Sequence, residues 1–211
     1  MKYFISPDFQ KFNKFTPRLR IGVLASGEGS NFQVLIDHFK QNTLDIEIKV
    51  LITNNKNAKC IKRASQSKIP YFILNNNYSN KKNFEDKIIE ILNRYDVELV
   101  VMAGWMRIAS EYFVNTFKNK IINIHPSILP SFKGKSPVSD ALKQKSFITG
   151  CSVHFVETEV DSGNIIIQAA LPIDHNDNEI TLTKKIHSLE HKILPYGVSE
   201  AGLIIRNKLR I

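Results

Sequence analysis

Three polar side chains carry the chemistry that this sequence suggests: Asn123, His125 and Asp161. Asn123 and His125 alternate with isoleucines in residues 120–125, so a strand would point both to the same face. An asparagine amide and a protonated imidazole aimed at one point would stabilise an oxyanion, which acyl transfer through a tetrahedral intermediate requires. A nearby Asp161 carboxylate would raise the pKa of the imidazole and hold its orientation. The spacing alone leaves an alternative, in which the three are an unrelated Asn, a turn His and a capping Asp.

A covalent nucleophile is not evident in the sequence. Ser26 lies in a glycine turn without a GxSxG pattern, and Cys60 and Cys151 stand in apolar contexts. An amine acceptor would therefore attack directly. The two cysteines are far apart and form neither a CxxC motif nor a Cys/His cluster, which predicts neither a zinc site nor a disulfide framework and favours a reducing cytoplasm.

Alternating buried strands and amphipathic helices would position these residues. The sequence predicts strands at 19–25, 46–52, 69–74, 97–104, 120–125, 150–156 and 164–171, and helices at about 32–39, 58–67, 84–92, 111–117, 138–143 and from 179 onward, interrupted or kinked at Pro195. This pattern predicts a single-domain, Rossmann-like α/β fold with a mostly parallel, twisted sheet of about seven strands flanked by helices. Pro126 and Pro130 end the strand after His125, which places the imidazole at the mouth of the carboxyl edge, where such sheets bind ligands.

Two further stretches could bind ligands. Residues 26–31 form a strand–glycine turn–helix arrangement, which suits a phosphate, although a simple tight turn is an equally good interpretation. The glycine spacing does not match the dinucleotide fingerprint. Residues 105–108 place an aromatic, a methionine and an arginine after a strand. They could line a pocket for a flat ring, or they could pack in the core with Arg107 in solvent.

Composition and charge limit the classes of partner and the cellular location that we expect. The 211 residues are 43% hydrophobic and 23% charged, with a formal net charge of +9 and a sequence pI near 9.5. That balance could serve a nucleic acid, a membrane surface or small anionic substrates, but the basic residues are scattered rather than gathered in a binding arm. No apolar run approaches the ~18 residues of a membrane helix, and no signal peptide is evident. We expect residues 1–18 to be an N-terminal extension outside the fold, residues 19–211 to be the domain, and the location to be cytoplasmic.

Four motifs carry a resemblance to a known family: residues 26–31 (SGEGSN), 103–108 (AGWMRI), 123–130 (NIHPSILP) and 160–163 (VDSG). In this order they closely resemble the phosphoribosylglycinamide formyltransferases, folate-dependent enzymes of purine synthesis, and the match spans about residues 20–203. The Asn-x-His-Pro-Ser stretch with a later Asp is specific to formyltransferases that use 10-formyltetrahydrofolate. The Ser-Gly-x-Gly-Ser-Asn loop points to the branch that acts on glycinamide ribonucleotide.

The resemblance implies a formyltransferase fold and a reaction: transfer of the formyl group of 10-formyltetrahydrofolate to the amine of N1-(5-phospho-D-ribosyl)glycinamide. It implies that Asn123 and His125 polarise the formyl oxygen and that Asp161 tunes His125 and assists proton movement. The substrate-binding positions it assigns are Gly29, Ser30, Asn31, His187 and Glu190; the folate positions are Lys81, Met106, Arg107, Ile108, Asn123, Glu157, Val160 and Asp161. We expect no metal, no nucleic-acid or membrane partner, and a monomer or homodimer.

The sequence departs from the family pattern at several positions. Glu28 replaces a residue that is commonly neutral and must point outward if a phosphate binds beside it. His187 stands where glutamine is frequent, and Lys81 where arginine is frequent. Residues 134–137 (GKSP) resemble the wider formyltransferase group, so the acceptor stays open.

Other functions also remain open. Formyltransferases acting on methionyl-tRNA or on a nucleotide-linked amino sugar typically carry an extra C-terminal domain, and formyltetrahydrofolate hydrolases usually carry an N-terminal one. We expect neither in this chain. A non-catalytic module that binds a phosphate ligand through the glycine turn alone is the alternative from another class.

Overall fold

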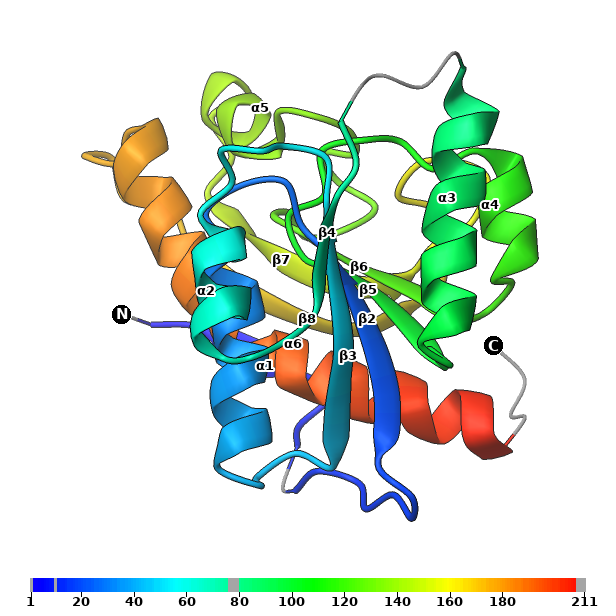
Figure 1. Cartoon of the computed structure of the whole chain (residues 1–211). Helices are drawn as coiled ribbons and strands as arrows, with labels where there is room; N and C mark the ends of the chain where they lie inside the picture. The colour runs from blue at the N-terminus through cyan, green and yellow to red at the C-terminus, as the bar shows by residue number, and fades with distance from the viewer. Residues whose placement is uncertain (1, 10, 76–79, 208–211) are drawn as a thin grey trace.

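The computed structural model describes residues 2–9, 11–75 and 80–207 and shows an α/β fold built on one sheet (Figure 1). The strands are β1 (Phe4–Ser6), β2 (Leu19–Leu24), β3 (Ile46–Thr53), β4 (Tyr71–Ile73), β5 (Leu99–Met102), β6 (Ile121–His125), β7 (Ile148–Phe155) and β8 (Ile165–Pro172). The helices are α1 (Ser30–Lys40), α2 (Cys60–Gln66), α3 (Lys81–Arg94), α4 (Glu111–Thr116), α5 (Pro137–Lys143) and α6 (Glu179–Asn207). The predicted fold class is confirmed.

The sheet changes direction next to the candidate site. Its order is β1-β8-β7-β6-β5-β2-β3-β4. The strands from β4 to β6 pair in parallel, whereas β7 pairs with β6, and β8 with β7, in antiparallel fashion. The antiparallel register sets His154 of β7 opposite Asn123 of β6, and Ser152 opposite His125. The end of β6 therefore meets side chains of β7, which a continued parallel sheet would place elsewhere.

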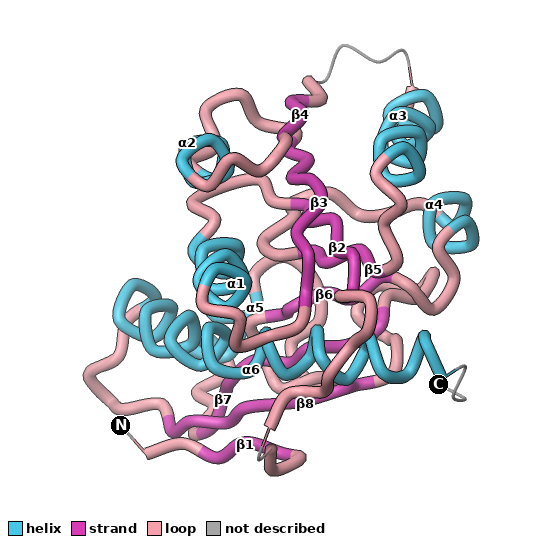
Figure 2. Tube along the Cα trace, turned by 60° about the horizontal axis from the view of Figure 1, so that its bottom comes forward, coloured by secondary structure: helices cyan, strands magenta, loops and turns pink. Residues whose placement is uncertain are grey.

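Helices cover both faces of the sheet. Figure 2 shows α1, α2 and α6 on one side and α3 and α4 on the other. Leu35 of α1 and Leu189 of α6 belong to one buried apolar cluster, while Ile88 of α3 and Phe113 of α4 belong to a second. Each helix buries one apolar stripe, as its spacing predicts. Strands buried on both faces form a rigid frame, which fixes the loops at their carboxyl ends.

The N-terminal segment differs from its prediction. We expected residues 1–18 to lie outside the fold, but Phe4–Ser6 form the edge strand β1 on β8, which adds a strand to the expected seven or so. Phe9 stacks on Tyr196 of α6, and the Asn13 amide donates to Glu200. Edge pairing and aromatic packing thus hold the segment on the sheet. The division into an extension and a domain at residue 19 stays a prediction.

The final helix is longer than the sequence suggests. α6 continues unbroken through Pro195 to Asn207, and Figure 1 shows its orange and red parts running in different directions. A proline inside a helix removes one backbone hydrogen bond and bends the helix without ending it. No helix within the described residues is long and apolar enough to cross a membrane.

Candidate active site

The end of β6 presents the two side chains that the sequence singled out. Asn123 and His125 lie on the same face of β6, as the alternation predicts. His125 is the last residue of the strand, but it is buried, with 5% of its surface exposed. We expected the imidazole at an open mouth. It lies deeper, because the chain after Pro126 folds back and places the Phe132 carbonyl against the ring.

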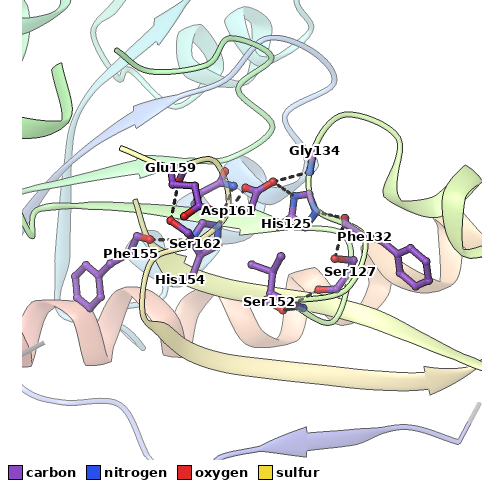
Figure 3. Close-up of polar contacts among 12 residues, drawn as sticks. His125, Ser127, Phe132, Gly134, Ser152, His154, Phe155, Glu159, Asp161 and Ser162 are labelled. Carbon is purple, nitrogen blue, oxygen red and sulfur yellow. Dashed lines mark hydrogen bonds and ion pairs between the residues drawn. The ribbon is translucent and has the colours of Figure 1, made fainter. Parts of the chain in front are cut away.

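Both ring nitrogens of His125 have partners. Nε2 lies 2.9 Å from the carbonyl oxygen of Phe132, and Nδ1 lies 3.4 Å from Oδ2 of Asp161 (Figure 3). A carbonyl only accepts, so Nε2 carries a proton and donates it. In the neutral ring Nδ1 is then unprotonated and faces the carboxylate. If Nδ1 takes up a second proton, it can donate a hydrogen bond to Asp161, and the carboxylate then stabilises the charged ring.

The protonation of His125 differs from the sequence prediction. Asp161 and the Phe132 carbonyl do raise the pKa of His125, but burial lowers it more, and the nearby His154 lowers it further. The net pKa lies below the ordinary value of 6.5. The free protein therefore holds His125 mainly neutral at pH 7. The sequence analysis weighed only the Asp161 carboxylate, because the depth of burial, which lowers this pKa, is not visible in the sequence.

Asp161 reaches this site from the turn between β7 and β8. Its φ is +52°, a left-handed conformation that Asp tolerates better than most residues. Oδ2 accepts a hydrogen bond from the Gly134 amide at 2.9 Å. Although burial acts to raise it, the pKa of Asp161 is lowered overall by its contacts with His154, Gly134 and His125. The carboxylate stays ionised beside His125.

His154 completes the group and was missed by the sequence analysis. Its Nδ1 lies 2.7 Å from the carbonyl oxygen of Phe155 and donates to it. Nε2 then accepts from the Asn123 amide at 3.3 Å and lies 3.6 Å from Asp161 Oδ1. Its only signal in the sequence is a histidine within an apolar strand, and the β6–β7 register was not predictable. This contact holds the Asn123 amide through one N–H, and its second N–H can donate to a ligand.

The glycine turn leads into α1 as predicted. Gly29 is the N-cap of α1, with φ +71° and no side-chain cap, and a Cβ on it would lie 2.6 Å from the Cβ of Cys60. Only glycine fits there. Ser26 Oγ accepts from the Met106 amide at 2.9 Å, which ties the turn to residues 105–108. The uncapped N-terminal amides of α1, with Ser30 and Asn31 in its first turn, suit an anion.

Glu28 points away from that turn. More than half of its side chain is exposed, and its carboxylate pairs with Lys59 at 2.9 Å and with Arg63 at 3.7 Å. Arg63 also donates to the Glu28 carbonyl at 2.9 Å. The negative charge is therefore neutralised on the outer side of the turn, which meets the condition set by the sequence analysis.

Asn31 joins α1 to α6. Its amide nitrogen donates to Glu190 Oε2 at 2.8 Å, and His187 Nε2 lies 4.0 Å from the same oxygen. Burial raises the pKa of Glu190 above its ordinary value, and the Asn31 hydrogen bond and His187 offset this only in part. The side-chain oxygen Oδ1 of Asn31 is buried without a hydrogen-bond partner among the described residues. The structure thus brings three of the predicted substrate-binding residues together.

Residues 105–108, which follow β5, partly pack in the core and partly lie exposed where they could line a pocket. Trp105 packs on the core and stacks on Phe84, whereas 78% of Met106 is exposed and Ile108 is half exposed. Arg107 lies over the Phe84 ring at 4.3 Å. The buried Glu85 carboxylate of α3 accepts hydrogen bonds from the Ser110 amide at 2.8 Å and from the Ser110 hydroxyl. These bonds fix the chain just after residues 105–108.

The remaining predicted folate positions lie at the surface. Lys81 is the first residue of α3 and is exposed, while Glu157 and Val160 are exposed in the turn that carries Asp161. Their roles stay predictions. Among the described residues, no group of three or more His, Cys, Asp or Glu side chains could hold a metal ion.

Comparison with known proteins gives a consistent result. The sequence pattern of the formyl transferase family matches residues 19–198. The phosphoribosylglycinamide formyltransferase of Bacillus subtilis is 40% identical over 182 residues, which are 86% of this chain and 93% of that protein. The human trifunctional purine biosynthetic protein adenosine-3 is 39% identical over 179 residues, but the chain spans only 18% of its length.

Solved structures agree with the sequence matches. Glycinamide ribonucleotide transformylase 1 from Symbiobacterium toebii has a TM-score of 0.88 at 33% identity, covering 98% of this chain and 95% of that one. A formyltetrahydrofolate deformylase from Pseudomonas syringae, at 23% identity and a TM-score of 0.83 over 92% of this chain and 63% of that one, shares the fold. The resemblance predicted from the motifs is confirmed, and the chain belongs to the formyl transferase family.

Proposed function

We propose that this protein transfers a formyl group from 10-formyltetrahydrofolate to the amine of N1-(5-phospho-D-ribosyl)glycinamide, a step of purine biosynthesis. The observation that carries the proposal is the group at the end of β6, where Asn123 bonds His154 and the rings of His125 and His154 lie 3.4 Å and 3.6 Å from the Asp161 carboxylate. The Bacillus subtilis relative, which this chain covers almost end to end, supports the acceptor.

The residues suit direct transfer. When bound, the folate supplies the formyl carbon on N10, a carbonyl activated toward attack by an amine. A C–N bond to the acceptor forms, negative charge builds on the formyl oxygen, and the bond to N10 then breaks. The free N–H of Asn123 can donate to that oxygen, and the exposed apolar side chains Met106, Ile108 and Val160 suit a flat ring.

His125 is the residue that would handle the proton. It begins neutral, with Nδ1 unprotonated, because burial lowers its pKa and Phe132 holds the proton on Nε2. Nδ1 can accept the proton that the attacking amine loses, directly or through a water molecule. The resulting imidazolium faces Asp161 and can return the proton to the departing N10. Asp161 therefore stabilises the charged ring that forms during the reaction.

The start of α1 and the neighbouring residues of α6 suit the acceptor. The amides at the start of α1, from Gly29 to Asn31, would hold the phosphate, and the side chains of Glu190 and His187 would face the glycinamide end. Both a phosphate monoester and a folate tail are anionic, so the formal charge of +9 favours their approach.

A comparison of acceptors tests the proposal. The purified protein is incubated with 10-formyltetrahydrofolate and, in separate reactions, glycinamide ribonucleotide, water alone or charged initiator tRNA. We expect rapid loss of the formyl donor with glycinamide ribonucleotide only. Equal loss with water alone would indicate a hydrolase, and loss with tRNA would indicate another formyltransferase.

The role of His125 is tested in the same assay. We expect His125→Ala to lower kcat by about 10²–10⁴-fold, the usual contribution of an acid–base group, with the KM of the acceptor little changed. His175→Ala is the matched control, because His175 is exposed in the loop before α6. Wild-type turnover by His125→Ala would contradict the assignment.

A further inference from the structure

One short loop touches both members of the candidate catalytic pair through its backbone. Residues 131–134 run between the end of β6 and α5. The Phe132 carbonyl accepts from His125 Nε2 at 2.9 Å, and the Gly134 amide donates to Asp161 Oδ2 at 2.9 Å. Figure 3 shows both contacts converging on the imidazole–carboxylate pair. The position of this loop therefore sets the partners of both groups.

A buried serine holds the loop in that position. Ser127, two residues after His125, has no exposed surface. Its hydroxyl donates to the Ser131 carbonyl at 2.6 Å and also lies 3.3 Å from the Phe132 carbonyl (Figure 3). Ser127 is in turn fixed to β7, since Ser152 Oγ donates to its carbonyl at 2.7 Å. The contacts form a chain from the sheet through Ser127 to the acceptor of the His125 proton.

The Ser127 hydroxyl supports an unusual loop conformation. The Phe132 carbonyl faces the buried His125 ring and the buried Ser127 hydroxyl, so its two partners come from the protein. Phe132 also has φ +55°, a left-handed conformation that a bulky residue adopts at a cost. A hydroxyl donor therefore stabilises a loop conformation that the backbone disfavours, and that conformation points the Phe132 carbonyl at His125.

We propose that Ser127 is a positioning residue: through the Phe132 carbonyl it keeps the His125 proton on Nε2 and leaves Nδ1 free beside Asp161. The proposal deepens the proposed function and rests on it for the meaning of the tautomer. The titratable groups that face His125 are Asp161 from the β7–β8 turn and His154 from β7. Neither fixes Nε2, so this task falls to the loop.

Three variants test the proposal: Ser127→Ala, Ser127→Cys and, as the matched control, Ser146→Ala. Ser146 also donates its hydroxyl to a backbone carbonyl, that of Ile148 at 2.7 Å, but in the exposed turn before β7. The thiol of Ser127→Cys nearly preserves the shape and donates more weakly. Thermal unfolding first establishes that each variant is folded. The kcat, KM, pH dependence of kcat/KM and nitrogen-15 NMR spectrum of the imidazoles are then measured, with the His125 signals identified by their loss in His125→Ala.

In Ser127→Ala we expect kcat to fall about two- to tenfold, the value of one neutral hydrogen bond, with both KM values within about twofold of wild type. The Phe132 hydrogen bond raises the pKa of His125, so weakening it moves the acid limb of the pH profile to lower pH. The NMR spectrum should lose its strict Nε2–H form. Ser127→Cys should lie between Ser127→Ala and wild type, and Ser146→Ala should match wild type.

An unchanged tautomer and pH profile in Ser127→Ala would overturn the proposal, even if stability falls. The NMR measurement needs no substrate. If the wild-type protein fails to formylate glycinamide ribonucleotide, the proposed function fails, while the effect of Ser127 on His125 is still decided. Should Ser127→Ala not fold, the Ser127→Cys spectrum decides: a wild-type tautomer and pH profile there would equally overturn the proposal.

Discussion

Asp161→Asn removes the carboxylate that faces both imidazoles while nearly keeping the shape of the side chain. In the protein, Asp161 Oδ2 lies 3.4 Å from His125 Nδ1, and both side chains are more than nine-tenths buried. Two unit charges at that distance attract by about 5 kcal/mol at an effective dielectric constant of about 20. This energy matters once His125 becomes charged during the reaction, so it belongs to the transition state rather than to substrate binding.

The asparagine recovers part of that interaction. Its amide oxygen can still accept from the Gly134 N–H and can face His125 as a dipole. If about half of the attraction is lost, kcat falls by about 60-fold. We expect both KM values to change little, because the neutral His125 of the resting protein gains little from the carboxylate.

The pH dependence provides a second readout. Asp161 raises the pKa of His125, so its loss lowers that pKa further below the ordinary value. The proposed reaction starts from neutral His125, and kcat/KM rises with pH as the ring loses its proton. In Asp161→Asn this rise should therefore occur at lower pH than in the wild-type protein. The assay is formyl transfer to glycinamide ribonucleotide between about pH 4.5 and 9, which brackets the ordinary histidine pKa.

Glu159→Gln is the matched control for this prediction. Glu159 lies in the same turn and carries the same charge, but it pairs with Lys133 at the surface, where ion pairs contribute little. We expect its kcat and pH profile to match wild type. The reasoning is refuted if Asp161→Asn retains kcat within threefold of wild type, or if Glu159→Gln loses as much activity as Asp161→Asn.

Two further substitutions test the buried carboxylates. Glu190→Gln keeps an acceptor for the Asn31 amide and removes a charge whose pKa burial raises, so the variant should be more stable by about 1–2 kcal/mol at pH 8. Below the ordinary carboxyl pKa of 4.5 the wild-type carboxyl is protonated in both the folded and the unfolded state, so this gain in stability should vanish; chemical denaturation at pH 4 and pH 8 checks it. The KM of the acceptor should rise, which steady-state kinetics checks. Glu85→Gln weakens the hydrogen bonds to Ser110 that fix the chain after Ile108. We expect the KM of the folate to rise and the KM of the acceptor to stay unchanged. A rise in both KM values would contradict this reasoning.

The sequence predicted the parts of the site that follow from local patterns. Strand alternation placed Asn123 and His125 on one face, and the strand–glycine turn–helix pattern placed Gly29 at the start of α1. These are nearest-neighbour effects of backbone geometry. Asp161 was named with Asn123 and His125 as a candidate partner, and the family resemblance added Glu190. The positions of both depend on distant parts of the chain, so periodicity alone could not bring them to the site.

The features that the sequence did not predict depend on the pairing of strands and on how deeply side chains are buried. His154 meets Asn123 only because β7 runs antiparallel to β6 with one particular register, and a shift by one residue would turn it to the other face. The N-terminal segment looked like an extension because residues 1–18 lack a regular apolar pattern. Its contacts are a three-residue edge strand and separate aromatic rings, including Phe9 on Tyr196, which no local pattern announces.

The reversal of strand direction after β6 explains how one site gathers both the proposed oxyanion donor and the proposed proton carrier. A parallel strand next to β6 would need a crossover connection, usually a helix, so many more residues would separate β6 from the next loop at this edge of the sheet. The antiparallel β7 instead returns directly beside β6, so His154 lies opposite Asn123, and the turn that follows β7 brings Asp161 to His125. Asn123 is thereby oriented by one imidazole, and His125 is held by one carboxylate. The parallel part of the sheet leads into the start of α1, so in the proposed reaction the parallel part would hold the anion and the antiparallel part would supply His154 and Asp161.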